Sequence, residues 1–247
     1  MYFQVSPHDT HDWDAVQTPV LFDLKVNGKP EKLLAQASRN GYFFVLNREA
    51  GGHVITAPFI KTNWAVGINK MGQPISNKEK QPPPDGTLVS PGSAGATNWM
   101  APSFDPETDL FYVTARRMWS MFYMTGTGKP EGWAGRDIGL WTRSAIVAID
   151  PRTGVIRWRH QIGTGWGVAG ILTTAGHLLF TADTSGNLLA LNPATGKTLW
   201  HVQLGALSHT GPSTYELDGR QYLLTPAGSM IFAWTLPRMQ TENVASP

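Results

Sequence analysis

Short runs of alternating hydrophobic and polar residues, separated by Gly, Pro, Asn and Asp turns, dominate this chain and predict β-strands joined by tight turns. Two segments, 145–158 and 187–200, are nearly the same. Each reads as an apolar strand, an Asx-Pro turn, a Gly and a second strand that ends in Trp. Their equivalent positions are 42 residues apart (Asp150 and Asn192), and a looser copy occupies 42–52. That period is typical of a four-stranded β-propeller blade.

Other strand-like runs fall where this unit requires them: 19–23, 32–37, 110–114, 170–173, 177–182, 213–217, 221–225 and 230–236. The pattern therefore predicts an all-β propeller of about four blades over residues 1–237, followed by a polar tail at 238–247. The Trp that ends each full copy of the repeat is expected to pack between blades.

Two stretches interrupt the repeat. Residues 69–95 are rich in Pro, Gly, Lys and Ser and predict a long loop. Residues 116–143 carry many aromatic and Met side chains, for which two interpretations stay open. They could form a lid over a substrate pocket, or an insertion that packs on a neighbouring blade or chain.

Composition excludes several classes of function. The net charge is +2, and no stripe of Lys and Arg is interleaved with aromatics, which argues against nucleic-acid binding. The chain has no Cys, so thiolate metal sites and disulfides are excluded, and an oxidising compartment is compatible. No apolar run approaches the ~18 residues of a membrane helix, and no basic signal-peptide region follows Met1.

Candidate chemistry gathers in Asp12-Trp13-Asp14 and in Ser38-Arg39-Asn40-Gly41. Alternate carboxylates can converge on one hard cation or divide into a base and a ligand. A guanidinium on a turn can pair with an anionic cofactor. The simpler alternatives are acids that cap a turn and a surface cation. For the nearby His11, a structural role is the simplest interpretation, ahead of one in positioning Asp12.

The two stretches, with Asp12 and Arg39 separated by 27 residues (39 − 12), resemble the active-site segments of pyrroloquinoline quinone (PQQ)-dependent alcohol dehydrogenases. The resemblance runs from Tyr2 to Trp234 and implies the C-terminal half of an eight-bladed propeller. It also implies oxidation of a primary alcohol by hydride transfer to the quinone, with a metal ion as Lewis acid.

Residue roles follow from the resemblance. It implies Asp12 as catalytic base and metal ligand, and Arg39 beside the quinone carbonyls as a catalytic and cofactor-binding residue. Asp14 resembles the second acid of lanthanide-using members, so the metal is expected to be a lanthanide(III) or Ca²⁺. Asn98-Trp99 resembles a motif near the cofactor, and Trp166 is a further candidate contact. Arg116 stands where many members have an Asn that touches the quinone.

The resemblance also implies a periplasmic location, a small alcohol as substrate and a cytochrome c-type electron acceptor. The chain by itself is expected to be inactive, and to self-associate through open blade faces, because the other half of the propeller would carry the remaining metal ligands. The main alternative is a non-catalytic propeller scaffold like the outer-membrane assembly proteins. PQQ enzymes that act on sugars or aldehydes are a third possibility.

Overall fold

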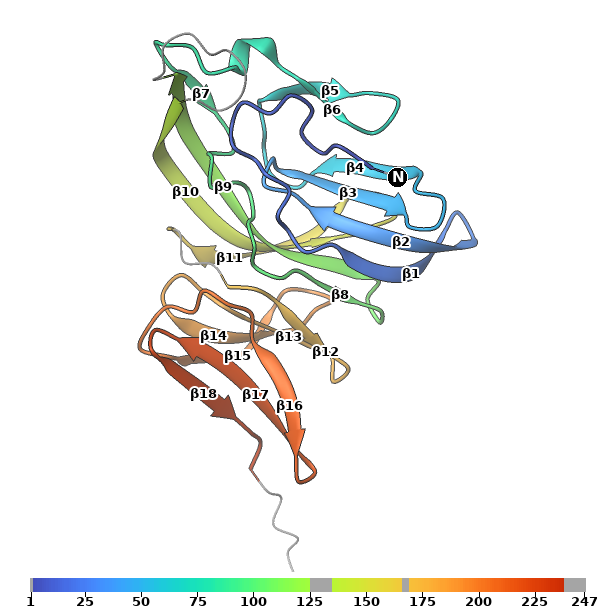
Figure 1. Ribbon diagram of the computed structural model, residues 1–247. Coiled ribbons are helices and arrows are strands. Elements are labelled where there is room, and N and C mark those ends of the chain that lie inside the picture. Colours follow the sequence, from blue (N-terminus) through green and yellow to red (C-terminus); the bar gives the residue numbers. More distant parts are fainter. Residues whose placement is uncertain (1, 125–134, 166–168, 238–247) are drawn as a thin grey trace, which may run out of the picture.

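The protein was analysed as a computed structural model, which describes residues 2–124, 135–165 and 169–237 (Figure 1). The predicted tail at 238–247 lies outside these residues. The described chain forms antiparallel sheets that follow one another as propeller blades, which confirms the predicted all-β propeller. No helix in the described residues is long and apolar enough to cross a membrane.

The first and third blades are four-stranded antiparallel meanders, as the repeat predicts. The first contains β1 (Val20–Val26), β2 (Lys29–Ala37), β3 (Tyr42–Asn47) and β4 (His53–Pro58). The third contains β12 (Leu172–Thr174), β13 (Leu178–Ala182), β14 (Asn187–Leu191) and β15 (Thr198–Gln203).

The second and fourth blades depart from this plan. The second contains β7 (Thr87–Val89), β8 (Ser103–Asp105), β9 (Leu110–Met124), β10 (Gly135–Ile149) and β11 (Ile156–Gly163). The fourth has three described strands, β16 (Ser213–Leu217), β17 (Arg220–Ala227) and β18 (Met230–Trp234). A separate hairpin consists of β5 (Ala65–Ile68) and β6 (Pro74–Ser76), followed by the 3₁₀ turn η1 (Lys78–Lys80).

The predicted long loop at 69–95 is wrong in part, because it contains β6, η1 and β7. The described part of 116–143 forms strands, which neither interpretation of this stretch predicted. β9 and β10 continue as a paired ladder up to Met124 and Gly135, beyond the body of the blade. Buried Met118, Ser120 and Phe122 alternate with more exposed neighbours, which is the period of a strand. The segment between the two strands, 125–134, lies outside the described residues.

Blades pack face to face through apolar side chains. Phe43 of the first blade shares a buried cluster with Val113 and Val147 of the second. Trp158 packs on the next blade, where its indole N–H donates to the carbonyl of Pro193 at 2.9 Å. A Cβ on Gly196 would lie 2.6 Å from the Trp158 ring, so glycine is required there for this packing. The predicted role of the repeat Trp between blades is confirmed for Trp158.

Candidate functional site

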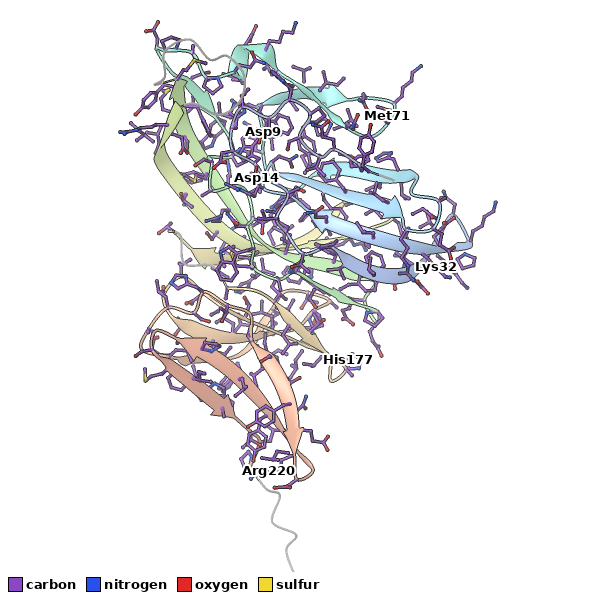
Figure 2. The ribbon with its side chains drawn as sticks, viewed as in Figure 1. Asp9, Asp14, Lys32, Met71, His177 and Arg220 are labelled. Carbon is purple, nitrogen blue, oxygen red and sulfur yellow. The ribbon has the colours of Figure 1, made fainter. Side chains whose placement is uncertain are left out.

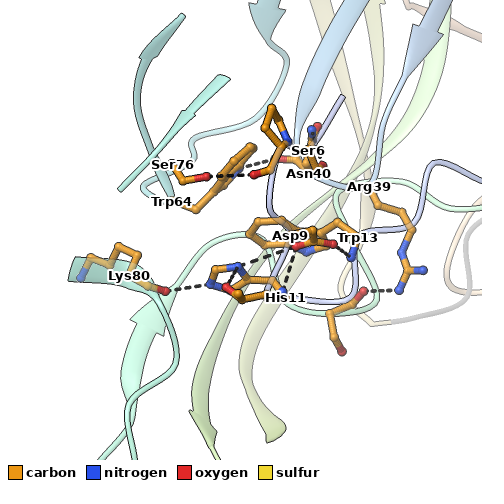
Figure 3. A network of polar contacts seen from close by, with 12 residues as sticks. Ser6, Asp9, His11, Trp13, Arg39, Asn40, Trp64, Ser76 and Lys80 are labelled. Atoms are coloured by element: carbon orange, nitrogen blue, oxygen red, sulfur yellow. Dashed lines mark hydrogen bonds and ion pairs between the residues drawn. The ribbon is translucent and has the colours of Figure 1, made fainter. Parts of the chain in front are cut away.

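A carboxylate organises the N-terminal loop that carries the candidate acids (Figure 3). The Asp9 side chain accepts the backbone N–H of His11 at 2.8 Å and that of Trp13 at 2.6 Å. Such a turn forms because a short Asp side chain can replace backbone acceptors that a loop lacks. Asp9 and Asp14 lie close to the first two blades, whereas His177 and Arg220 belong to the third and fourth (Figure 2).

Aromatic packing holds the same loop against the protein. Trp13 is buried and donates its indole N–H to the carbonyl of Gly92 at 2.9 Å. The His11 ring stacks on Trp13 at 4.4 Å and donates through Nε2 to the carbonyl of Lys80 at 2.7 Å. Burial lowers the pKa of His11, against the smaller raising effects of the Lys80 carbonyl and of Asp9. His11 is therefore a structural side chain of this loop.

Asp12 lies between these two anchored residues in a left-handed backbone conformation, with φ of 63°. Asp adopts this region more readily than most residues, yet it persists only where the surroundings hold it. The Oδ2 atom of Asp12 lies 3.6 Å from Nη2 of Arg39, and the carboxylate remains 45% exposed. Burial raises the pKa of Asp12, while Arg39 lowers it and the neighbouring Asp14 and Asp9 raise it.

Arg39 follows β2 and is fixed from several sides. Its backbone N–H donates to Oε1 of Gln17 at 3.2 Å, and Nη2 donates to the carbonyl of Ser93. Ser93 is in turn clamped by Asp137, which accepts from its backbone N–H at 3.0 Å and from its hydroxyl at 2.6 Å. Arg39 is thus pre-positioned beside Asp12 before any ligand binds.

The segment 93–98 brings a second cation to the same place. Its Ala96 N–H donates to the Arg39 carbonyl at 2.8 Å, and the Arg116 N–H donates to Ala96 at 2.6 Å. The buried Arg116 guanidinium donates to the carbonyl of Ala94. Burial, and then the charge of Arg39, lower the pKa of Arg116 to about 10, so the Arg116 guanidinium is still charged at neutral pH.

The other predicted cofactor contacts lie beyond this segment. The Asn98 amide donates to the carbonyl of Ala94 at 3.0 Å, and its oxygen accepts the N–H of Trp99 at 2.9 Å. The Trp99 ring is 54% exposed. Trp166 lies outside the described residues. The structure therefore brings Asp12, Arg39 and Arg116 together, and it uses the Asn98 side chain to hold its own turn.

Asp12 and Asp14 have oxygen donors that suit a hard cation, but a lanthanide or Ca²⁺ ion takes about 6–8 oxygens. Asp14 is exposed and follows Asp12 by two residues. Within the described residues, no group of three His, Cys, Asp or Glu side chains is arranged to hold a metal. These two carboxylates supply only part of a metal site.

Three residues that sequence patterns do not single out support the site: Gln17, Ser93 and Asp137. Ser93 and Asp137 are 44 positions apart and meet only because the β9–β10 hairpin extends past its blade. No local motif signals such a pairing. The presence of Arg116 in the site is signalled only by the resemblance, which expects an Asn there.

Two protein-family models match the chain. The β-propeller domain of glucose, ethanol and alcohol dehydrogenases matches residues 2–58, which include Asp12, Asp14 and Arg39. A second model, described as outer membrane protein assembly factor BamB, matches residues 142–234, which include both full copies of the repeat.

Known proteins extend these matches over most of the chain. The quinoprotein alcohol dehydrogenase PedH of Pseudomonas putida is 36% identical over 243 residues, covering 92% of this chain and 40% of PedH. The solved quinohemoprotein alcohol dehydrogenase ADHIIG from Pseudomonas putida HK5 has a TM-score of 0.84 at 28% identity, covering 93% of this chain and 37% of the other.

A europium-containing methanol dehydrogenase has a TM-score of 0.80 at 28% identity, covering 90% of this chain and 41% of that one. The chain thus spans about two fifths of the length of these proteins. In sequence and in fold, this chain is therefore similar to part of the PQQ-dependent alcohol dehydrogenases.

Proposed function

We propose that this chain provides the C-terminal part of a PQQ-dependent dehydrogenase that oxidises a primary alcohol. The observation that carries the proposal is the approach of Asp12 to Arg39, at 3.6 Å. A carboxylate beside a fixed guanidinium supplies a proton acceptor next to a site that stabilises developing negative charge.

Arg39 also has the features that an anionic quinone requires. Its side chain is only 12% exposed, and its buried Nε atom has no hydrogen-bond partner among the described residues. A bound quinone oxygen or carboxylate could satisfy that donor. Arg116 adds a second positive charge on the same side of the segment 93–98.

In this proposal Asp12 accepts the proton of the alcohol hydroxyl through a carboxylate oxygen. The bound quinone supplies the two-electron acceptor for the hydride that leaves the alcohol carbon. Arg39 stabilises the negative charge that this transfer creates. Asp9, through its two backbone hydrogen bonds, holds Asp12 in its strained conformation during the reaction.

A metal ion completes the proposal, with Asp12 and Asp14 as two of its ligands and either a lanthanide(III) or Ca²⁺ as the ion. The europium-containing relative supports a lanthanide. Replacing Asp14 with Asn should then weaken activation by La³⁺ more than activation by Ca²⁺, because the trivalent ion gains more from each added negative charge. Equal effects on the two metals would remove Asp14 from the metal site.

The remaining parts of the proposal follow from the same resemblance: a periplasmic location, a small alcohol substrate and a cytochrome c-type acceptor. Open blade faces also support self-association of the isolated chain, since Leu21 of the first blade is 59% exposed and Ile231 of the fourth is 72% exposed. Light scattering of the purified 247-residue chain tests this, and a stable monomer would contradict it.

The main test replaces Arg39 with Gln in the protein purified from its native host, assayed by dye-linked alcohol oxidation with PQQ and Ca²⁺ or La³⁺. We expect kcat to fall about 10²-fold, as for other lost electrostatic donors. The acidic limb of kcat/KM should also move to higher pH, because Arg39 lowers the pKa of Asp12. The matched control is Arg48→Gln, which removes an ion pair with Asp23 in the first blade. An unchanged kcat and pH profile in the Arg39 variant would refute the proposal.

The second candidate function is a non-catalytic propeller scaffold, which the match of residues 142–234 to the BamB model favours. A scaffold function does not require Asp12 to be held in a strained conformation beside Arg39. If the purified protein bound no PQQ and oxidised no alcohol with either metal, the scaffold would become the better explanation.

A further inference from the structure

A cationic pocket lies between the first and second blades, apart from the candidate active site. Its volume is about 290 Å³, and its lining includes Lys61, Arg117, Arg143 and Arg159 but no acidic residue of the described chain. Arg117 directly follows Arg116 on β9, and successive side chains of a strand point to opposite faces. The Arg117 side chain that lines the pocket therefore points away from Arg116 of the candidate active site.

Strand pairing in the second blade brings two of the pocket's cations together. Arg117 and Arg143 are directly paired across β9 and β10, two strands that run side by side along the second blade (Figure 1). Like charges in such a pair destabilise a sheet. The Trp141 ring offsets part of this repulsion, because the guanidinium carbons of Arg117 and Arg143 lie 5.4 Å and 5.7 Å from its centroid.

Arg159 of β11 adds a third guanidinium from the outer edge of the blade. It donates to the carbonyl of Phe59 at 2.9 Å, which directs it toward the first blade. Burial and the charge of Arg117 lower its pKa. Within the described residues, none of the four lining cations forms an ion pair with a carboxylate. No ion pair with an acidic side chain of the described residues therefore offsets the repulsion between these four cations.

We propose that this pocket binds a small polyanion, a phosphate ester or a polycarboxylate with two or more negative charges. Several guanidiniums that converge without acids match such a ligand, because each planar fork can bind an oxyanion through two hydrogen bonds. The volume is close to the lower end of small-molecule sites, about 300 Å³. The amide of Gln161, which also lines the pocket, adds a neutral donor or acceptor for specificity.

The test is titration calorimetry of the purified protein with inorganic phosphate and with citrate, against sodium chloride at matched ionic strength. We expect saturable binding of the polyanions and none of chloride. The double variant Arg117→Gln/Arg159→Gln should weaken binding by at least about tenfold, since each charged hydrogen bond is worth more than that factor. Thermal melting of each variant checks that it folds, and the single variant Arg143→Gln replaces the double one if it does not.

The matched control is Arg157→Gln. Arg157 lies two residues before Arg159 on β11 and is exposed like it, yet it does not line the pocket. Its affinity for citrate should stay within about twofold of the parent, because a solvent-exposed charge outside the site is screened by salt. An equal loss in the control would show that general surface charge binds the anion. That result, non-saturable binding, or unchanged citrate affinity in the pocket variants would overturn the proposal.

Discussion

Replacing Asp9 with Asn tests how the loop positions the candidate base. The Asp9 carboxylate accepts two backbone N–H groups, from His11 at 2.8 Å and from Trp13 at 2.6 Å. These bonds fix the residues on both sides of Asp12, whose φ of 63° is otherwise unfavourable. Asn keeps one acceptor oxygen and loses the charge, so one of the two N–H groups faces an amide that donates rather than accepts.

An unsatisfied buried donor costs about 1–3 kcal/mol. The Asp9 side chain is 20% exposed, so water offsets part of this, and we expect a loss of about 2 kcal/mol. For a protein of this size, that corresponds to a fall in melting temperature of roughly 4–8 °C. If Asp12 then moves by about 1 Å, kcat should fall by up to about 10²-fold with a smaller change in KM.

The pH profile separates a positioning role from a general loss of stability. The charge of Asp9 raises the pKa of Asp12, so Asp9→Asn should move the acidic limb of kcat/KM to lower pH, opposite to Arg39→Gln. The matched control is Asp23→Asn, because that carboxylate is 67% exposed and pairs with Arg48 on the surface. Such pairs contribute about 0–1 kcal/mol. An Asp9 variant with the control's stability and an unmoved acidic limb would refute this account of the loop.

Two further predictions concern the same region. Gly95→Ala should lower both stability and kcat, because the added Cβ would lie 2.7 Å from Cβ of Arg39. The control is Gly28→Ala, where the backbone has the same φ of 80° but no atom lies within 4 Å of the added Cβ. In thermal melts this control should show only the backbone cost, about 1 kcal/mol. Burial lowers the pKa of His11 below its ordinary 6.5, so the unfolded chain takes up the proton first and stability falls as pH drops from 6.5 toward the lowered value. In a plot of unfolding free energy against pH, His11→Phe should flatten this part of the curve. The control His177→Gln changes an exposed histidine and should leave the curve unchanged. The opposite pattern would show that His11 is not the titrating group.

The repeat predicted the blades well because its information is local. A strand, an Asx turn and a second strand form one hairpin, so the structure of segments 145–158 and 187–200 is determined by residues within each segment. Trp158 was predicted between blades for the same reason. The β9–β10 extension was missed because aromatic and Met side chains occupy both of its faces, which hides the period of two.

The candidate site was predictable only where a motif carried it. Asp12, Asp14 and Arg39 were found from two short stretches whose spacing resembles a known family. Their supports were not, because Ser93 and Asp137 meet through tertiary structure, 44 positions apart. Arg116 shows that residue roles cannot all be carried over from a resembling family. The family pattern expects an Asn at this position, whereas this chain has an Arg that the structure brings beside Arg39.

The charges of this site act on one another. Arg39 lowers the pKa of Asp12 and also that of Arg116, so it favours an ionised Asp12 carboxylate while it disfavours the charge of Arg116. At a pKa of about 10, Arg116 still keeps its proton at neutral pH beside Arg39, while Asp14 and Asp9 are the carboxylates that neighbour Asp12. A reaction that adds negative charge beside these guanidiniums relieves their mutual repulsion as it proceeds. Stabilisation of that kind is greater in the transition state than in the ground state, which is the condition for lowering a barrier.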